Sequence, residues 1–391
     1  MLQSYSRNFW LLSFAMFLFM TSFNLIMPEL NQFITSLGGA DQKGLVISLF
    51  TISAGFSRPF SGKLSDLIGR KKVMWVGIII CFIVSLLYPL SFSVWFFLTL
   101  RFIHGFSAGF SPTGATALVT DLLPDNNRGA GMGIWGTFIS LGIGIGQSLG
   151  SYIQLTLGMT NLFIIAAIFS ALAAILLHAV TETLERPVPF ELKHLKITWK
   201  DVFEPSVLPA AIVMFLSAMC SGIIFVLTPD LSGFLGISNK GFFFGIYVIS
   251  TIVIRLLTSS LSDRIGRRKA LLIGMSILAI SMVLIAFAKD VQSYILASVV
   301  FGLATGMSSP TLFAWTADLS HKERRGVGAG TMFIALELGI MAGSLSTMLI
   351  YSNTMETIKG AFLIGAGMAV LCLLFLIFHL KTYASESLPD A

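Results

Sequence analysis

A carboxylate inside apolar sequence is the residue of this chain best suited to proton chemistry. Glu337 lies in the run IALELGIMAG, with no other charge near it in the sequence. A charged side chain at the centre of a bilayer costs about 2.5 to 3.5 kcal/mol on insertion scales, so such a residue is a functional candidate by default. A lone buried carboxyl group favours its protonated form and can take up and release protons. We therefore predict proton binding at Glu337, with a structural hydrogen-bonding role as the alternative.

Three further titratable residues are candidates for proton coupling. Glu29 follows Pro28 and Asp230 follows Pro229, each at the end of an apolar run. Both carboxylates have an alternative as rim residues exposed to water. His104 is the third candidate, because histidine titrates near neutral pH.

Three polar residues in apolar runs are candidates for contact with a solute. Arg101 lies in the run LTLRFIHGFSAGF, and its alternative is a long side chain that extends to the membrane interface. Asn24 and Gln147 are uncharged and deep within their runs. We expect these two to face a cavity without driving coupling.

A charged signature occurs twice at a fixed offset of 197 residues. It reads RPFSGKLSDLIGRKK from Arg58 and RLLTSSLSDRIGRRK from Arg255. The first copy contains Arg58, Gly62, Asp66, Gly69 and Arg70, and the second contains Arg255, Asp263, Gly266 and Arg267. The same offset relates Asp121 and Arg128 to Asp318 and Arg325.

The first copy of the signature has the residues of a charged helix-to-helix turn. Asp66 can pair with Arg58, or more easily with an arginine or a backbone N–H at the start of a neighbouring helix. Gly62 is expected to let two helices approach closely, and Gly69 to allow a tight reversal. Such a cluster can hold neighbouring helices together in one conformation and release them in another. The alternative is that its basic residues only set the membrane topology.

Each half also contains an aspartate followed seven residues later by an arginine. These pairs are Asp121 with Arg128 and Asp318 with Arg325. We expect each pair to link to the charged signature of its own half, in a structural and gating role rather than in coupling.

The composition places these residues in a membrane protein. Of the 391 residues, 55% are hydrophobic and 11% are charged, with a mean hydropathy of +0.87, whereas about 25% of residues are charged in soluble proteins. Apolar runs long enough to cross a bilayer as helices recur along the chain. The predicted spans are 9–31, 43–66, 73–93, 94–120, 128–154, 161–180, 206–231, 241–262, 270–288, 291–317, 326–351 and 359–379.

The twelve spans form two repeats of six, so we predict an all-α membrane protein with two parallel six-helix bundles. The predicted domains are an N-terminal bundle at 1–180, a cytoplasmic linker at 181–205 and a C-terminal bundle at 206–391. An even number of spans gives both halves the same orientation, a geometry known in secondary transporters. The transport pathway is expected between the two halves.

The distribution of charge predicts the orientation. Most lysines and arginines fall on one side of the predicted spans, and this excess marks the cytoplasmic side. Both termini are therefore expected in the cytoplasm, at an inner or plasma membrane, and the net charge of +6 needs no nucleic-acid partner. The linker contains Pro187 and Pro189, and we expect a short amphipathic helix after them at the membrane surface.

Three motifs carry a resemblance to a known family. Gly62, Asp66, Gly69, Arg70 and Lys72 closely resemble the signature between helices 2 and 3 of the major facilitator superfamily, and the second copy has Ser259 in place of Gly62. Arg101, Gly105 and Gly109 resemble the helix 4 signature. The resemblance implies the major facilitator fold and a gating role for the loop motif.

A third motif resembles the drug-exporting, proton-antiporting branch of that superfamily. It is GIGIGQSLGSYI, with Gly142, Gly146 and Gly150 in place, Gln147 where the branch has proline and Ser151 where it has glycine. Close glycine packing between helices explains the same spacing.

These observations predict a secondary transporter and exclude several other classes. We expect proton-coupled efflux of a small amphipathic or drug-like solute, because a cavity rich in Phe and Met with few charges suits such solutes. The alternatives are an importer or facilitator of a sugar or other metabolite, and a membrane sensor or enzyme that does not transport. No nucleotide-binding loop or metal-ligand spacing is present in the sequence, so we expect no enzyme, cofactor or metal. The expected partners are the solute, protons and membrane lipid, with a monomer as the functional unit.

Overall fold

The computed structural model describes residues 5–123, 128–258, 261–321 and 325–386. Side chains at 128–130, 200–201, 263, 325–326 and 379–386 are outside the described part. The described chain is helical throughout, and its contacts divide it into two units. The first unit comprises Met1–Val202 and Ser238–Gly245, and the second comprises Phe203–Ile237 and Ile246–Ala391.

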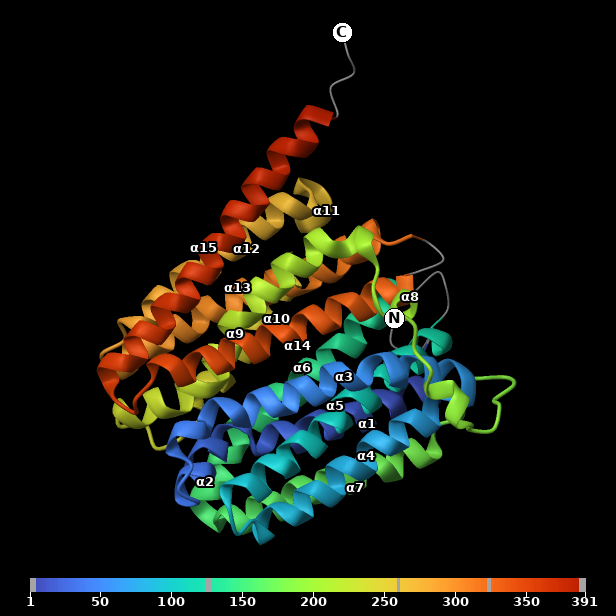
Figure 1. Cartoon of the computed structure of the whole chain (residues 1–391), viewed down its shortest axis with the longest axis horizontal. Coiled ribbons are helices and arrows are strands. Elements are labelled where there is room, and N and C mark those ends of the chain that lie inside the picture. The colour runs from blue at the N-terminus through green and yellow to red at the C-terminus, as the bar shows by residue number, and fades with distance from the viewer. Residues whose placement is uncertain (1–4, 124–127, 259–260, 322–324, 387–391) are drawn as a thin grey trace. The chain divides into compact units, whose positions relative to one another are not determined.

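Six long helices build the first unit (Figure 1). They are α1 (Arg7–Leu25), α3 (Lys43–Ile68), α4 (Arg70–Leu87), α5 (Val94–Leu122), α6 (Arg128–Leu157) and α7 (Met159–Ala179). After α1 come a 3₁₀ turn, η2 (Met27–Glu29), and the short α2 (Leu30–Ser36). Serine side chains cap two helix starts: Ser6 accepts from the Phe9 N–H and Ser93 from the Phe96 N–H, each at 3.2 Å.

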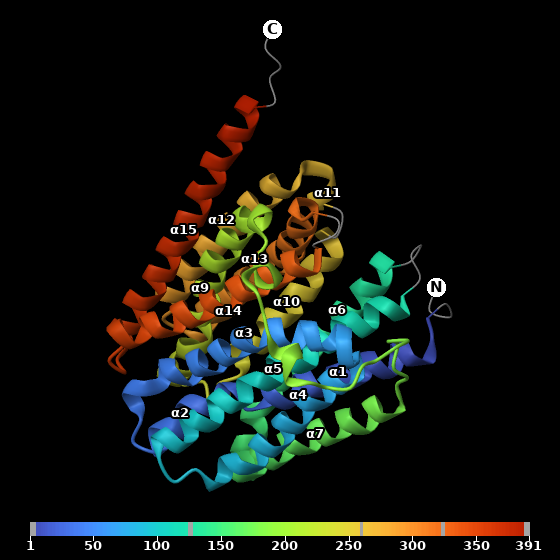
Figure 2. The same ribbon diagram turned by 45° about the vertical axis from the view of Figure 1, so that its right-hand side comes forward.

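The second unit repeats this order (Figure 2). Its helices are α9 (Leu208–Phe234), α10 (Phe242–Thr258), α11 (Leu261–Ile265), α12 (Arg267–Ala286), α13 (Val291–Leu319), α14 (Arg325–Ile350) and α15 (Met355–Glu386). The packing also repeats. As α1 packs on α6 and α7, α9 packs on α14 and α15; as α4 packs on α5 and α7, α12 packs on α13 and α15. The predicted fold of two six-helix repeats is confirmed.

Apolar side chains fill the first unit at both ends. One cluster includes Phe9, Met16, Met74, Leu118 and Leu177, and the other includes Leu25, Ile34, Val84, Phe97 and Phe163. The opposite faces of α4 and α7 present large apolar side chains outward, such as Ile83 and Ile175. In a bilayer these faces meet lipid tails instead of water, so their exposure carries no penalty.

Nine stretches in the described residues are helical, long and apolar enough to cross a membrane. The other three predicted spans correspond to α3, α5 and α10, which are also helical. The segment between the units differs from the prediction. It holds only single turns, η6 (Leu192–Leu195) and α8 (Trp199–Val202), instead of an amphipathic helix. One cause is that its backbone pairs elsewhere, since the Val188 N–H donates to the Leu67 carbonyl and the Lys196 carbonyl accepts from Lys63 Nζ.

Candidate functional site

Arg70 is the centre of the charged signature in the first unit. Gly69, with φ of +124°, reverses the chain between α3 and α4 and so places Arg70 at the start of α4. The Arg70 guanidinium lies 3.3 Å from the Asp66 carboxylate and 3.1 Å from that of Asp121, and it donates to the Ser65 carbonyl at 2.8 Å. Of the two kinds of partner predicted for Asp66, the structure shows the arginine at the start of the next helix.

The second unit contains the same pair 197 residues later. Arg267 Nε lies 2.9 Å from Asp318 Oδ2, after a reversal at Gly266 with φ of +89°. A further guanidinium nitrogen of Arg267 donates to Ser262 Oγ at 2.7 Å. The side chains of Asp263, Arg128 and Arg325 are outside the described residues.

Gly62 is not packed closely within the first unit. A methyl group built on Gly62 would meet nothing within 4 Å, so no helix of that unit approaches this glycine closely. The close approaches occur at other glycines. On α5, Gly109 packs against the Ala54 carbonyl of α3, where a methyl group would come to 2.7 Å.

Sequence reasoning missed Glu182, which joins the cluster from the segment after α7. Its two carboxylate oxygens accept from the Arg70 and Lys71 N–H groups, at 3.2 Å and 3.0 Å. The signal was available, because Glu182 is the first acidic residue after the sixth apolar run and acidic groups favour helix N-termini.

Arg101 is buried inside the first unit, with 1% of its surface exposed. Its alternative, extension to the membrane interface, is therefore wrong. Nε donates to the Val46 carbonyl at 3.1 Å, another guanidinium nitrogen donates to the Tyr88 hydroxyl at 3.3 Å, and the Phe50 ring lies 4.5 Å from Cζ. Dipoles and a ring face thus replace the water that Arg101 loses on burial.

His104 belongs to the same network and is fully buried. Its Nδ1 lies 2.8 Å from the Tyr88 hydroxyl, and its Nε2 lies 3.3 Å from Cys81 Sγ. Cys81 in turn lies 3.4 Å from Ser22 Oγ. The network thus connects α1, α4 and α5.

Glu29 is also buried, with 1% of its surface exposed, so the alternative of a rim residue exposed to water is wrong. Ser151 of α6 donates its hydroxyl to Glu29 Oε1 at 2.5 Å. Lys240 Nζ lies 3.4 Å from Glu29 Oε2 and also contacts the Gln32 side chain.

The segment that carries Lys240, Ser238–Gly245, belongs to the first unit by its contacts, although it connects α9 to α10. The Gly241 N–H donates to Ser151 Oγ at 3.0 Å. A methyl group on Gly241 would collide with the Gln147 carbonyl, so only glycine fits there. Ser151 therefore bridges the Glu29 carboxylate and the Gly241 backbone.

Asn24 and Gln147 contact each other inside the first unit. Gln147 Nε2 donates to Asn24 Oδ1 at 3.1 Å, between α6 and α1. The three glycines of the GIGIGQSLG motif line the same helix crossing. Methyl groups on Gly142 and Gly146 would come within 2.6 Å of the Phe17 carbonyl and 2.8 Å of the Thr21 carbonyl, and one on Gly150 would collide with the Leu25 carbonyl.

In the second unit the candidate carboxylates lie in different surroundings. Glu337 lies in α14 and is 7% exposed, whereas Asp230 in α9 is half-buried. Asp230 Oδ2 accepts from the Tyr351 hydroxyl at 2.7 Å. Arg255, in α10, is also half-buried.

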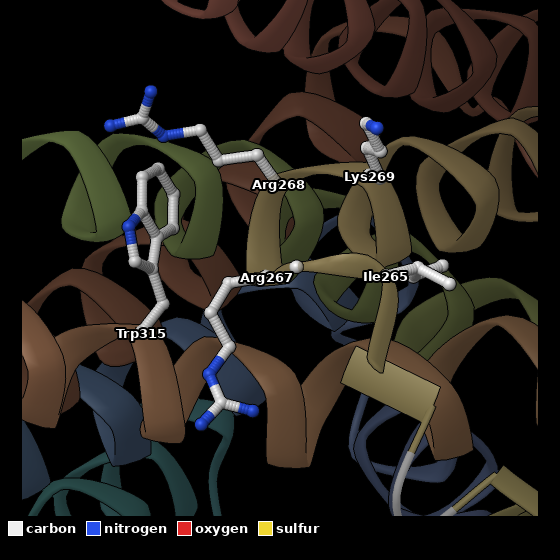
Figure 3. A pocket seen from close by; sticks show the side chains of 6 residues that line it. Ile265, Arg267, Arg268, Lys269 and Trp315 are labelled. Carbon is white, nitrogen blue, oxygen red and sulfur yellow. The ribbon is translucent and has the colours of Figure 1, made fainter. Parts of the chain in front are cut away.

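Two hollows lie within the units. One, of about 320 Å³, is lined in the second unit by Arg267, Arg268, Lys269 and Trp315 among others (Figure 3). Arg268 lies over the Trp315 ring, and the three basic side chains point in different directions, so they form no common binding site. The other, of about 210 Å³, is an apolar groove in the first unit, lined chiefly by Phe56, Phe60, Phe106, Phe110 and Leu195. In the described residues no group of three His, Cys, Asp or Glu is placed to hold a metal ion.

The sequence matches a family model along nearly its whole length. The model of the Major Facilitator Superfamily matches residues 12–244 and 210–390. The chain belongs to the Major Facilitator Superfamily. It is therefore a multi-pass membrane transporter and not an enzyme.

Curated relatives match over most of the chain. It is 26% identical over 361 residues to a multi-drug resistance efflux pump PmrA homolog of Lactococcus lactis, covering 88% of this chain and 87% of the relative. It is 24% identical over 359 residues to the quinolone resistance protein NorA of Staphylococcus aureus, with 87% and 89% covered.

Solved structures of two transporters show the same fold. The human organic anion transporter MFSD10 matches with a TM-score of 0.73 at 21% identity, and a point mutant of the nucleoside transporter NupG matches with 0.78 at 15% identity. Each comparison covers 95% of this chain and 99% of the other.

Proposed function

We propose that this transporter exports small amphipathic, drug-like solutes in exchange for protons. The observation that carries the proposal is that relatives named as drug efflux and quinolone resistance proteins match it over nearly their whole length. The apolar groove lined by four phenylalanines supports the solute class, because apolar walls favour apolar and aromatic solutes.

Glu337 is the residue that we propose for proton coupling. It is a buried carboxylate within a predicted membrane span. Ionisable residues are energetically costly there, so those that occur are functional candidates. Glu29 is paired with Lys240 in a contact that we assign below to a gate, and Asp230 is only half-buried. His104 is fully buried, and its two ring nitrogens contact Tyr88 and Cys81, an arrangement that suits a structural role.

The clusters at the two ends of the first unit are the proposed gates. With both termini in the cytoplasm of an inner or plasma membrane, the Arg70 cluster lies on the cytoplasmic side and the Glu29–Lys240 pair on the outer side. The positive charges at the Arg70 end support this orientation. A transporter that opens alternately can hold such contacts at one end while it releases them at the other. We propose that one chain in membrane lipid completes this cycle as a monomer.

The test compares Glu337→Gln with the wild-type protein in inside-out vesicles, using a fluorescent amphipathic cation as solute. We expect Glu337→Gln to abolish accumulation driven by an acidic lumen while the purified variant still binds the solute in a thermal-shift assay. Glu356→Gln, at an exposed acid in the first turn of α15, is the matched control and should transport normally. Unchanged gradient-driven accumulation in Glu337→Gln would assign the proton site to another residue.

A further inference from the structure

The segment Thr181–Leu184 follows α7 and lies on the charged cluster around Arg70. Glu182 places its carboxylate on the first two N–H groups of α4, those of Arg70 and Lys71. Lys71 returns the contact, because its Nζ donates to the His178 and Val180 carbonyls at the end of α7, at 2.8 Å and 2.7 Å. The positive start of α4 and the negative end of α7 are thus each neutralised by a charge from the other element.

Thr183 contacts the ion pair itself. Its hydroxyl donates to Asp121 Oδ2 at 2.6 Å, and this is the oxygen that lies 3.1 Å from Arg70 Nε. The Thr183 hydroxyl therefore holds the Asp121 carboxylate in the orientation in which it pairs with Arg70. Asp121 is partly exposed, with 35% of its side chain accessible, so without Thr183 water can compete for this oxygen.

The second unit makes the corresponding ion pair, because Arg267 Nε lies 2.9 Å from Asp318 Oδ2. Its last helix, α15, continues to Glu386, whereas α7 ends at Ala179 and is followed by the segment Thr181–Leu184. The contacts of Glu182 and Thr183 are therefore described for the first unit.

We infer that Glu182 and Thr183 are positioning residues of the cytoplasmic gate. Glu182 anchors the start of α4, and Thr183 orients Asp121 toward Arg70, so both stabilise the state in which the Arg70 cluster is intact. The segment after α7 also begins the connection to the second unit. The inference rests on the proposed transport cycle.

Thr183→Val tests this role because it removes only the hydroxyl and keeps the shape of the side chain. We expect the maximal rate of solute transport to fall by about fivefold, which corresponds to the loss of one ordinary hydrogen bond at a partly exposed site, with KM unchanged. Thr183→Ser keeps the hydroxyl and should restore the wild-type rate. Glu182→Gln should act in the same direction, whereas Glu185→Gln, at an exposed acid three residues later, should have no effect.

Hydrogen exchange at the start of α4 gives a readout that does not depend on transport. Glu182→Gln should speed exchange of the amides at Arg70 and Lys71, and Glu185→Gln should not. Unchanged exchange would overturn the anchoring role. Wild-type transport by Thr183→Val, or equal defects in Thr183→Val and Thr183→Ser, would overturn the gating role. If the wild-type protein moves no solute, the proposed function is wrong. The hydrogen-exchange result still tests whether Glu182 anchors the start of α4.

Discussion

Replacement of Lys240 by methionine should release the segment Ser238–Gly245 from the first unit. Methionine has a similar length but no charge, so the change leaves a buried Glu29 carboxylate without the lysine, while the Ser151 hydroxyl still donates to it. Breaking a buried ion pair from one side costs about 3 to 5 kcal/mol. The Lys240 side chain keeps 22% of its surface exposed, so we take the lower value, about 3 kcal/mol. We call the segment docked when it packs on the first unit as in the structure. An energy of about 3 kcal/mol lowers the equilibrium ratio of docked to released segment by about 100-fold.

Labelling of a cysteine under this segment measures the shift. Ser148 of α6 accepts a hydrogen bond from Asn239 through its carbonyl, so Ser148→Cys reports on the docked segment. The native Cys81, Cys220 and Cys372 are all buried and should react slowly. We expect Lys240→Met to speed labelling by a membrane-impermeant maleimide at least tenfold, and Glu29→Gln added to it to reverse most of this gain. Wild-type labelling rates in a folded Lys240→Met protein would refute the reasoning.

Other substitutions test the remaining contacts. Gly150→Ala should lower thermal stability by about 1 to 3 kcal/mol because its methyl collides with the Leu25 carbonyl, and Gly133→Ala on the same helix, with open space around it, should not; equal effects would contradict the packing argument. Tyr88→Phe removes the hydroxyl shared by two buried partners and should cost about 1 to 3 kcal/mol in a denaturation assay; a neutral result would mean that the network is not held through this phenol.

The fold and the ion pair between Asp66 and Arg70 were predictable, because both follow from local patterns that repeat at one offset. Helix lengths follow from apolar runs, and the reversal at Gly69 places Arg70 within reach of Asp66. The contacts that depend on folding were not predictable. Arg101 donates hydrogen bonds to Val46 and Tyr88, which lie on two other elements. No spacing of residues along the chain predicts those contacts.

The same reason explains the differences at Glu29 and Gly62. Proline before Glu29 indicated the end of a span, but burial of this carboxylate depends on Lys240, which is 211 residues away. Gly62 fits the family signature, yet the close helix crossings occur at other glycines, such as Gly109. A motif thus identified the region correctly without specifying which contact each of its residues makes.

The central claim is that this protein exports solute from the cell, driven by protons that move inward down their gradient. Inside-out vesicles that contain the wild-type protein and a fluorescent amphipathic cation test it directly. Acidification of the vesicle lumen should drive accumulation of the cation, and an ionophore that collapses the pH difference should stop it. Accumulation at the same rate with and without the pH difference would contradict the account.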